Sequence, residues 1–208
     1  MTTPPFRPAT AADADRAVPL IYSSGPAAFD YVFGDDRPGR AVDFLAAAFV
    51  DGRGEFGWRN HRVATIDGQV VAAGGAWDGR ATLRFTAAAA AQILRFYGPL
   101  RAPGVVLRGL RTEAVIRPPR PDEWYIAHLG VREDLRGRGL GTALVRDLLT
   151  AADPACHRHA ALDVAVTNPR AEALYARLGF RVVAERPSRL ANRLHRVPDH
   201  RRMVLSLR

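Results

Sequence analysis

The chain has 208 residues, enough to bury the core of one domain, and we expect a single domain over residues 1–208. All 30 basic residues are arginines spread along the whole length, so the net charge of +9 is only weak support for a nucleic-acid-binding protein. The single cysteine excludes an internal disulfide. No signal-like N-terminus and no run approaching ~18 apolar residues is present, so we expect a cytoplasmic protein rather than a secreted or membrane-spanning one.

Residues 1–77 predict two helices and three strands. In chain order these are a strand over 6–10, a helix over 11–22, a helix over 40–50, and strands over 61–66 and 69–77. Thr10 is a suitable N-cap for the first helix, and the Ser-Ser-Gly-Pro sequence at 23–26 predicts a break after it. Asp67-Gly68 lies between two β-rich runs, as is typical of a tight hairpin.

Residues 78–122 predict one helix and then irregular chain. The helix covers 81–97 and is expected to stop at Gly98-Pro99, and an arginine- and proline-rich stretch follows up to Pro121. We expect the large apolar side chains of the helix to pack on the body of the protein; they are Leu83, Ile93, Leu94 and Phe96.

The remainder predicts alternating strands and helices. The expected elements are a buried central strand over 124–131, a helix from Leu140 ended by Asp153-Pro154, a strand over 160–166, a helix from Asn168-Pro169 closed by Gly179, and an antiparallel pair over 180–185 and 202–207. Residues 186–200 form a long basic connection inside that pair.

A glycine-rich loop between the central strand and the next helix is the clearest functional signal. It reads Arg136-Gly137-Arg138-Gly139-Leu140-Gly141-Thr142, and its glycines let a ligand approach the backbone where the helix presents free N–H groups. This predicts a phosphate site. A nucleoside-triphosphate P-loop is disfavoured because the chain has no lysine. A dinucleotide fingerprint would need glycine at Thr142, although Asp163 lies where its ribose-binding acid belongs, so this alternative stays open.

The pattern Arg136-x-x-Gly139-x-Gly141 resembles the acyl-coenzyme A loop of the GNAT N-acetyltransferase superfamily. A second block, Asn168-x-x-Ala171-x-x-Leu174-Tyr175-x-x-x-Gly179-Phe180, is similar to another pattern of that superfamily and follows in the right order. The resemblance implies an α+β fold, layered α/β/α, with a mixed and mostly antiparallel sheet of about six to seven strands flanked by helices. It also makes residues 78–122 an insertion between the third and fourth strands, where they could wall the acceptor site.

The resemblance implies that acetyl-CoA is the acyl donor and that the acceptor is a small-molecule amine or a protein amino group. A backbone N–H freed by a bulge in the fourth strand would bind the thioester oxygen, near Leu129, Gly130 or Val131. A glycine at position 130 is equally well explained by tight packing where the strand meets the loop, without any contact to a ligand. The other implied coenzyme A contacts are Arg136, Gly137, Arg138, Gly139, Leu140, Gly141, Thr142, Asn168 and Tyr175.

Four residues are candidates for proton transfer. Tyr175 matches the tyrosine of the superfamily and is the expected general acid, because a phenol with a pKa near ~10 stays protonated at neutral pH. Asp163 is the first candidate for the base; it precedes Tyr175 by the 12 residues at which ribosomal-protein N-terminal acetyltransferases place a glutamate. Glu123 is the second candidate and His128 the third.

Other readings stay open beside the enzyme. The chain could be a non-catalytic acyl-CoA-sensing or partner-binding module, or, with less support, a nucleic-acid-binding protein. The sequence Cys156-His157-Arg158-His159 offers close ligands without a distant fourth one, so we predict no metal. The acceptor and the oligomeric state, for which a homodimer is compatible with the resemblance, are not specified by the sequence.

Overall fold

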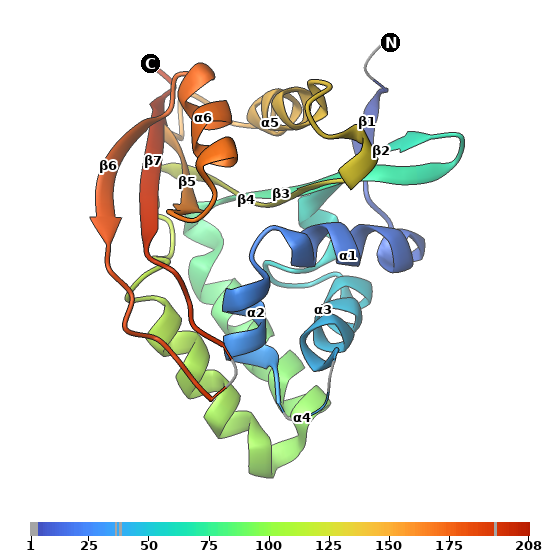
Figure 1. Ribbon diagram of the computed structural model, residues 1–208, viewed down its shortest axis with the longest axis vertical. Coiled ribbons are helices and arrows are strands. Elements are labelled where there is room, and N and C mark those ends of the chain that lie inside the picture. The colour runs from blue at the N-terminus through green and yellow to red at the C-terminus, as the bar shows by residue number, and fades with distance from the viewer. Residues whose placement is uncertain (1–3, 36, 38, 194) are drawn as a thin grey trace.

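The computed structural model describes residues 4–35, 37, 39–193 and 195–208, so the first three residues of the N-terminal segment lie outside the described part. The strands form one seven-stranded sheet in the order β1-β2-β3-β4-β5-β7-β6 (Figure 1). Only β4 and β5 pair in parallel among these strands. This confirms the mixed, mostly antiparallel sheet. The bounds are β1 Phe6–Pro8, β2 His61–Ile66, β3 Gln69–Asp78, β4 Glu123–Val131, β5 His159–Ala165, β6 Arg181–Arg186 and β7 His200–Ser206.

Helices cover both faces of the sheet (Figure 1). One face carries α1 (Ala14–Ser23), α2 (Pro26–Phe33), α3 (Arg40–Asp51) and α4 (Thr82–Thr112), and the other carries α5 (Leu140–Leu149) and α6 (Pro169–Arg177). Because successive strand residues point to opposite faces, neighbours such as Val63 and Ala64 enter two different cores, one under α1 and α3 and one under α5. No helix in the described part of the chain has the length and apolar content to cross a membrane.

The N-terminal region departs from the sequence prediction in two places. The chain enters α1 through a short 3₁₀ turn over Ala11–Asp13, and Asp13 pairs with Arg7 at 2.7 Å. The predicted break at 23–26 is shorter than expected, because Pro26 begins α2. Proline is well tolerated at the first position of a helix, where no backbone N–H is needed. The sequence prediction missed this helix.

The prediction for residues 98–122 is wrong over its first half. The helix continues to Thr112, with a kink at Gly98, whose φ of 72° only glycine adopts readily. Pro99 is the first residue after the kink, where proline is tolerated, and Pro103 follows at the start of the second turn. The expected packing is also partly wrong. Ile93 is buried and Phe96 packs on the core, whereas Leu83 and Leu94 are 85% and 52% exposed.

The central strand β4 is irregular in a way that opens the sheet. Ala73 pairs with Gly130 and Gly75 pairs with Ala127, so His128 and Leu129 both lie opposite Gly74 in a bulge. His128 has a φ of 60°, which is rare for a residue with a side chain. The parallel pairing of β4 with β5 ends at Tyr125, opposite Ala161, although both strands continue. Beyond Tyr125 the two strands therefore diverge.

The packing of Gly130 against α1 gives a direct test of this arrangement. A Cβ at Gly130 would lie 2.1 Å from the backbone oxygen of Leu20, so the strand fits against α1 only without a side chain. We expect Gly130→Ala to lower the free energy of unfolding by at least about 2 kcal/mol, measured by urea denaturation.

Gly104→Ala is the matched control, because a Cβ there meets only the flexible side chain of Arg108 at 3.7 Å and alanine favours the helix. The account of the packing is contradicted if the two variants are equally stable.

Candidate active site

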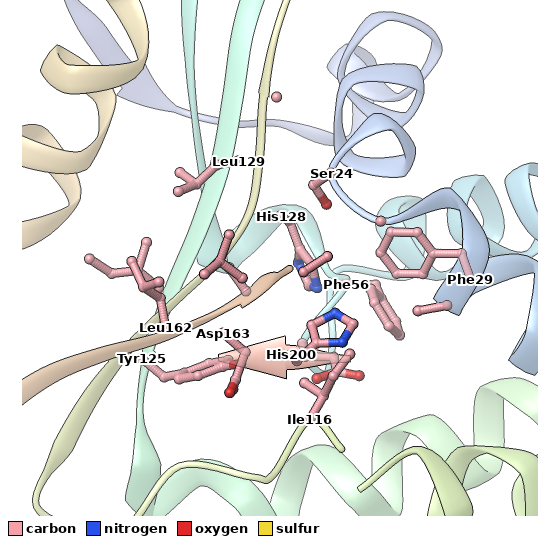
Figure 2. Close-up of a pocket in the computed structure, with 18 of the residues that line it drawn as sticks. Ser24, Phe29, Phe56, Ile116, Tyr125, His128, Leu129, Leu162, Asp163 and His200 are labelled. Atoms are coloured by element: carbon pink, nitrogen blue, oxygen red, sulfur yellow. The ribbon is translucent and has the colours of Figure 1, made fainter. Parts of the chain in front are cut away.

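One cavity of about 670 Å³ is lined by the divergent part of β4, by β5, and by the helices on both faces. The segment between β3 and β4 contributes the side chains Phe85, Ile93, Val106 and Glu113 to its wall. Figure 2 shows residues of the bulge, Tyr125 and Asp163 around the same space as Phe29 of α2. The cavity therefore joins the glycine loop to the region under α2 and α4.

The glycine loop has the backbone shape that the sequence predicts. Gly137 and Gly139 have φ values of 79° and 86°, in the left-handed region that favours glycine. Gly139 is the N-cap of α5. Apart from the adjoining residues of the chain, no heavy atom of the described residues lies within 4 Å of where a Cβ on Gly137 or Gly139 would be. The first N–H groups of α5 lack acceptors within the helix, so the loop is an open cradle for an anion.

The predicted loop contacts do not all lie in the cavity. Arg136, Gly137 and Gly141 line it, whereas Arg138, Gly139 and Thr142 are not part of its lining. The side chain of Leu140 is buried in the core under α5, so its backbone alone can face a ligand.

The bulge brings the predicted oxygen-binding segment to the cavity. Leu129, Gly130 and Val131 all line it. The bulge frees backbone groups that a regular ladder would pair, which is the feature that the predicted donor requires. The close approach of the Leu20 backbone explains why residue 130 is a glycine: the strand packs there against α1 without room for a side chain.

Tyr175 and Asn168 reach the cavity from α6. Tyr175 is half-buried against Phe180, and burial raises the pKa of its phenol above the ordinary value. Within the described part of the chain its hydroxyl has no hydrogen-bond partner, so it is free to donate to a ligand. The Oδ1 of Asn168 accepts from the N–H of Ala171 at 3.1 Å and caps α6, as the sequence predicts.

Asp163 and Glu123 both belong to a buried cluster around Arg202. The Nη1 of Arg202 donates to Asp163 at 2.6 Å, and its Nη2 donates to Glu123 at 3.2 Å. The hydroxyl of Tyr125 also donates to Asp163, at 2.8 Å. Asp163 lines the cavity, where burial raises the pKa of its carboxyl, but Glu123 does not line it. Their carboxylates are thus engaged in holding β4, β5 and β7 together.

His128, which is half-buried, forms a pair with the buried His61, a residue that the sequence prediction did not single out. The Nδ1 of His61 lies 2.9 Å from the carbonyl oxygen of Gly57, so it must donate, and its Nε2 then accepts from the Nδ1 of His128 at 3.2 Å. This leaves the Nε2 of neutral His128 unprotonated. Burial lowers the pKa of His61 to about 4 and that of His128 well below its usual range. The sequence signal for His61 is weak, because a histidine in a predicted strand is the one feature that marks it.

Glu55 is a cavity residue that sequence reasoning missed altogether. It lies in the turn before β2 and is half-buried. Burial and the nearby charge of Glu113 raise the pKa of its carboxyl to about 7. Glu55 follows a glycine in an irregular segment, so neither periodicity nor a motif distinguishes it from a surface acid.

Among the described residues no three histidine, cysteine, aspartate or glutamate side chains gather as metal ligands would. Cys156 is exposed, and the Nδ1 of His157 accepts from the N–H of Asp153 at 3.1 Å. The absence of a metal stays a prediction.

The cluster around Arg202 predicts a large loss of stability on removal of its cation. Arg202→Met would leave the buried Glu123 without its arginine and Asp163 with only the 3.5 Å ion pair to Arg186, and we expect it to lower the free energy of unfolding by about 3–5 kcal/mol in chemical denaturation. Arg201→Met is the control: Arg201 pairs with Glu172 and Glu185 in a partly exposed position, where solvent screens the charges, so its loss should cost much less. Equal losses would show that the cluster does not hold the strands.

Comparison with known proteins gives a family and a fold. The model of the acetyltransferase (GNAT) family matches residues 33–180. The chain resembles the solved N-acetyltransferase from Staphylococcus aureus Mu50, with a TM-score of 0.70 and 18% identity over 97% of this chain and 100% of that one.

Two further solved structures share the fold. The protein yncA from Salmonella typhimurium, solved with its cofactor acetyl-CoA, has a TM-score of 0.56 and 16% identity, over 100% of this chain and 95% of that one. Polyamine N-acetyltransferase from Drosophila melanogaster has a TM-score of 0.55 and 18% identity, over 98% and 99%. The family match extends over well more than half of the sequence, and the chain belongs to the acetyltransferase (GNAT) family.

Proposed function

We propose that this protein transfers the acetyl group of acetyl-CoA to a primary amine by direct attack, with both substrates bound at once. The observation that carries the proposal is that the glycine loop, the β4 bulge and Tyr175 line a single cavity. Family membership supports an acyltransferase, and yncA, solved with acetyl-CoA, supports the donor. The polyamine N-acetyltransferase from Drosophila melanogaster supports an amine as acceptor.

The residues of the loop fit the phosphate groups of coenzyme A. The open backbone at Gly137 and Gly139 and the N-terminus of α5 would hold the pyrophosphate, with Arg136 supplying a positive charge at the cavity wall. Of the other predicted loop contacts, Gly141 lines the cavity, and Arg138, Leu140 and Thr142 would act through the backbone or from the outer rim. The gap where β4 leaves β5 lies between the loop and the bulge. It would receive the part of acetyl-CoA between the pyrophosphate and the thioester.

In this scheme acetyl-CoA supplies a thioester whose carbonyl carbon the amine attacks. A backbone N–H among residues 129–131 would bind the carbonyl oxygen as it gains negative charge. The phenol of Tyr175 would give a proton to the departing sulfur, a role supported by its unpartnered hydroxyl in the cavity and by the raised pKa that keeps it protonated.

The candidates for the base differ in what surrounds them. Asp163 is held by Arg202 and Tyr125, and Glu123 lies outside the cavity lining. His128 has an unprotonated Nε2, but its low pKa makes it a weak acceptor for the proton of an ammonium group. We therefore propose none of these three as the principal base.

We also propose a cytoplasmic location, as the sequence predicts. The exposed free thiol of Cys156 suits a reducing compartment.

The test of the function is thiol release from acetyl-CoA with a panel of primary amines and peptides. We expect release with at least one acceptor, and we expect Tyr175→Phe to lower the turnover number by about 10²-fold or more because the proton donor is lost. Coenzyme A affinity, measured by calorimetry, should change little in this variant.

Thiol release with none of the acceptors would favour a non-catalytic acyl-CoA-binding module. Near-normal turnover in Tyr175→Phe would remove this residue from the proton transfer.

A further inference from the structure

The cavity continues beyond the bulge into a chamber with largely apolar walls. Aromatic rings line it from three directions: Phe29 from α2, Phe56 from the turn before β2, and Trp77 from β3. The rings of Phe29, Phe56 and Trp77 lie 6.0, 5.1 and 5.6 Å from the ring of His128, measured between centroids. Figure 2 shows Phe29 and Phe56 beside His128. The chamber therefore adjoins the residue at which β4 bulges.

Glu55 is an acidic residue that lines this cavity and has no ion pair with any of the described arginines. It directly precedes Phe56, whose ring stacks on His128, and it is one of the residues that line the cavity. Its charge acts on Tyr125, another lining residue. Within the described part of the chain Glu55 makes no hydrogen bond or ion pair. The contrast with Asp163 is plain, since that carboxylate lines the same cavity and is paired with Arg202.

An unpaired carboxylate among aromatic walls is costly unless a ligand satisfies it. The chain contains 30 arginines, and the other buried acids, such as Asp13 and Glu123, each have one as a partner. A protonated primary amine would bring the positive charge and the hydrogen-bond donors that the Glu55 carboxylate needs, and the aromatic rings that line the same cavity suit a cation and its apolar body.

We propose that Glu55 is the catalytic base, which binds the ammonium group of the acceptor and takes its proton. The assignment rests on the proposed function. One proton moves from the ammonium nitrogen to the Glu55 carboxylate. The neutral amine then forms a C–N bond to the carbonyl carbon, and the C–S bond breaks with its electron pair on sulfur. The sulfur takes a proton from Tyr175, Tyr175 regains one from the nitrogen, and Glu55 returns its proton to solvent.

The surroundings of Glu55 set the pH at which it can act. Burial and Glu113, an exposed residue just after α4 that also lines the cavity, raise the pKa of Glu55 to about 7. A raised folded-state pKa means that the carboxylate form is lost as pH falls through 7. The other titratable or charged groups that line the cavity near it are His128 and His200, whose pKa values burial lowers, Tyr125, whose pKa burial raises, Asp163, which is paired with Arg202, and Arg117.

The pH dependence of kcat/KM for thiol release tests the assignment. We expect activity of the unaltered protein to rise with pH through a midpoint near 7. Glu55→Gln should lose this limb and lower kcat/KM at pH 8 by about 10²-fold or more. Glu113→Gln should move the midpoint to lower pH, because removing a nearby negative charge lowers the pKa of Glu55.

Two controls separate this assignment from its alternatives. Asp15→Asn removes an exposed carboxylate of α1 outside the cavity and should leave the profile unchanged. Coenzyme A should raise the melting temperature of Glu55→Gln as much as that of the unaltered protein, which shows that the variant folds and binds the donor.

A limb near pH 7 that persists in Glu55→Gln, or that does not move in Glu113→Gln, overturns the assignment while leaving the acetyltransferase proposal in place. Failure of the unaltered protein to release thiol with any amine overturns the proposed function, and the role of Glu55 as base with it.

Discussion

The divergence of β4 from β5 is the constraint on which the rest of the structure depends. The two parallel strands are paired over three residues and part after Tyr125, while β4 keeps its pairing to β3 through the bulge at His128 and Leu129. Continued pairing would fill the gap with a regular ladder. Because the strands part, the backbone of β4 faces a cavity, and the loop that follows β4 begins at its mouth.

Buried charge stabilises the point where the strands separate. Arg202 on β7 reaches Asp163 on β5 and Glu123 at the start of β4, so one guanidinium joins three strands. Removing one partner from such a buried set leaves an uncompensated charge, so its members depend on one another. This gives Asp163 a structural explanation, and it leaves Glu55, with Glu113 near it, as the cavity carboxylates that have no ion pair among the described residues.

Local signals allowed much of the fold to be predicted. The hairpin at Asp67-Gly68, the Asn168 cap and the glycine loop each follow from residue types at fixed positions, and each has the expected backbone. Features set by tertiary packing were not predictable. Continuation of α4 past Gly98 depends on burial of Ala102 and Val105. The hydrogen-bond partners of Asp163, which are Tyr125 and Arg202, lie 38 and 39 residues away in the sequence. The position of Glu55 in the cavity was not predictable, because the residues that line the cavity with it come from distant parts of the chain.

The most direct test of this account is amide hydrogen exchange with and without acetyl-CoA. If the donor lies along the edge of β4 that β5 leaves open, it should slow exchange at residues 129–131 and at the amides of residues 137–142. Strands β1 and β2, at the far edge of the sheet, should show no change. Protection confined to the loop, or located outside the cavity, would contradict the claim that the divergence of β4 and β5 creates the donor site.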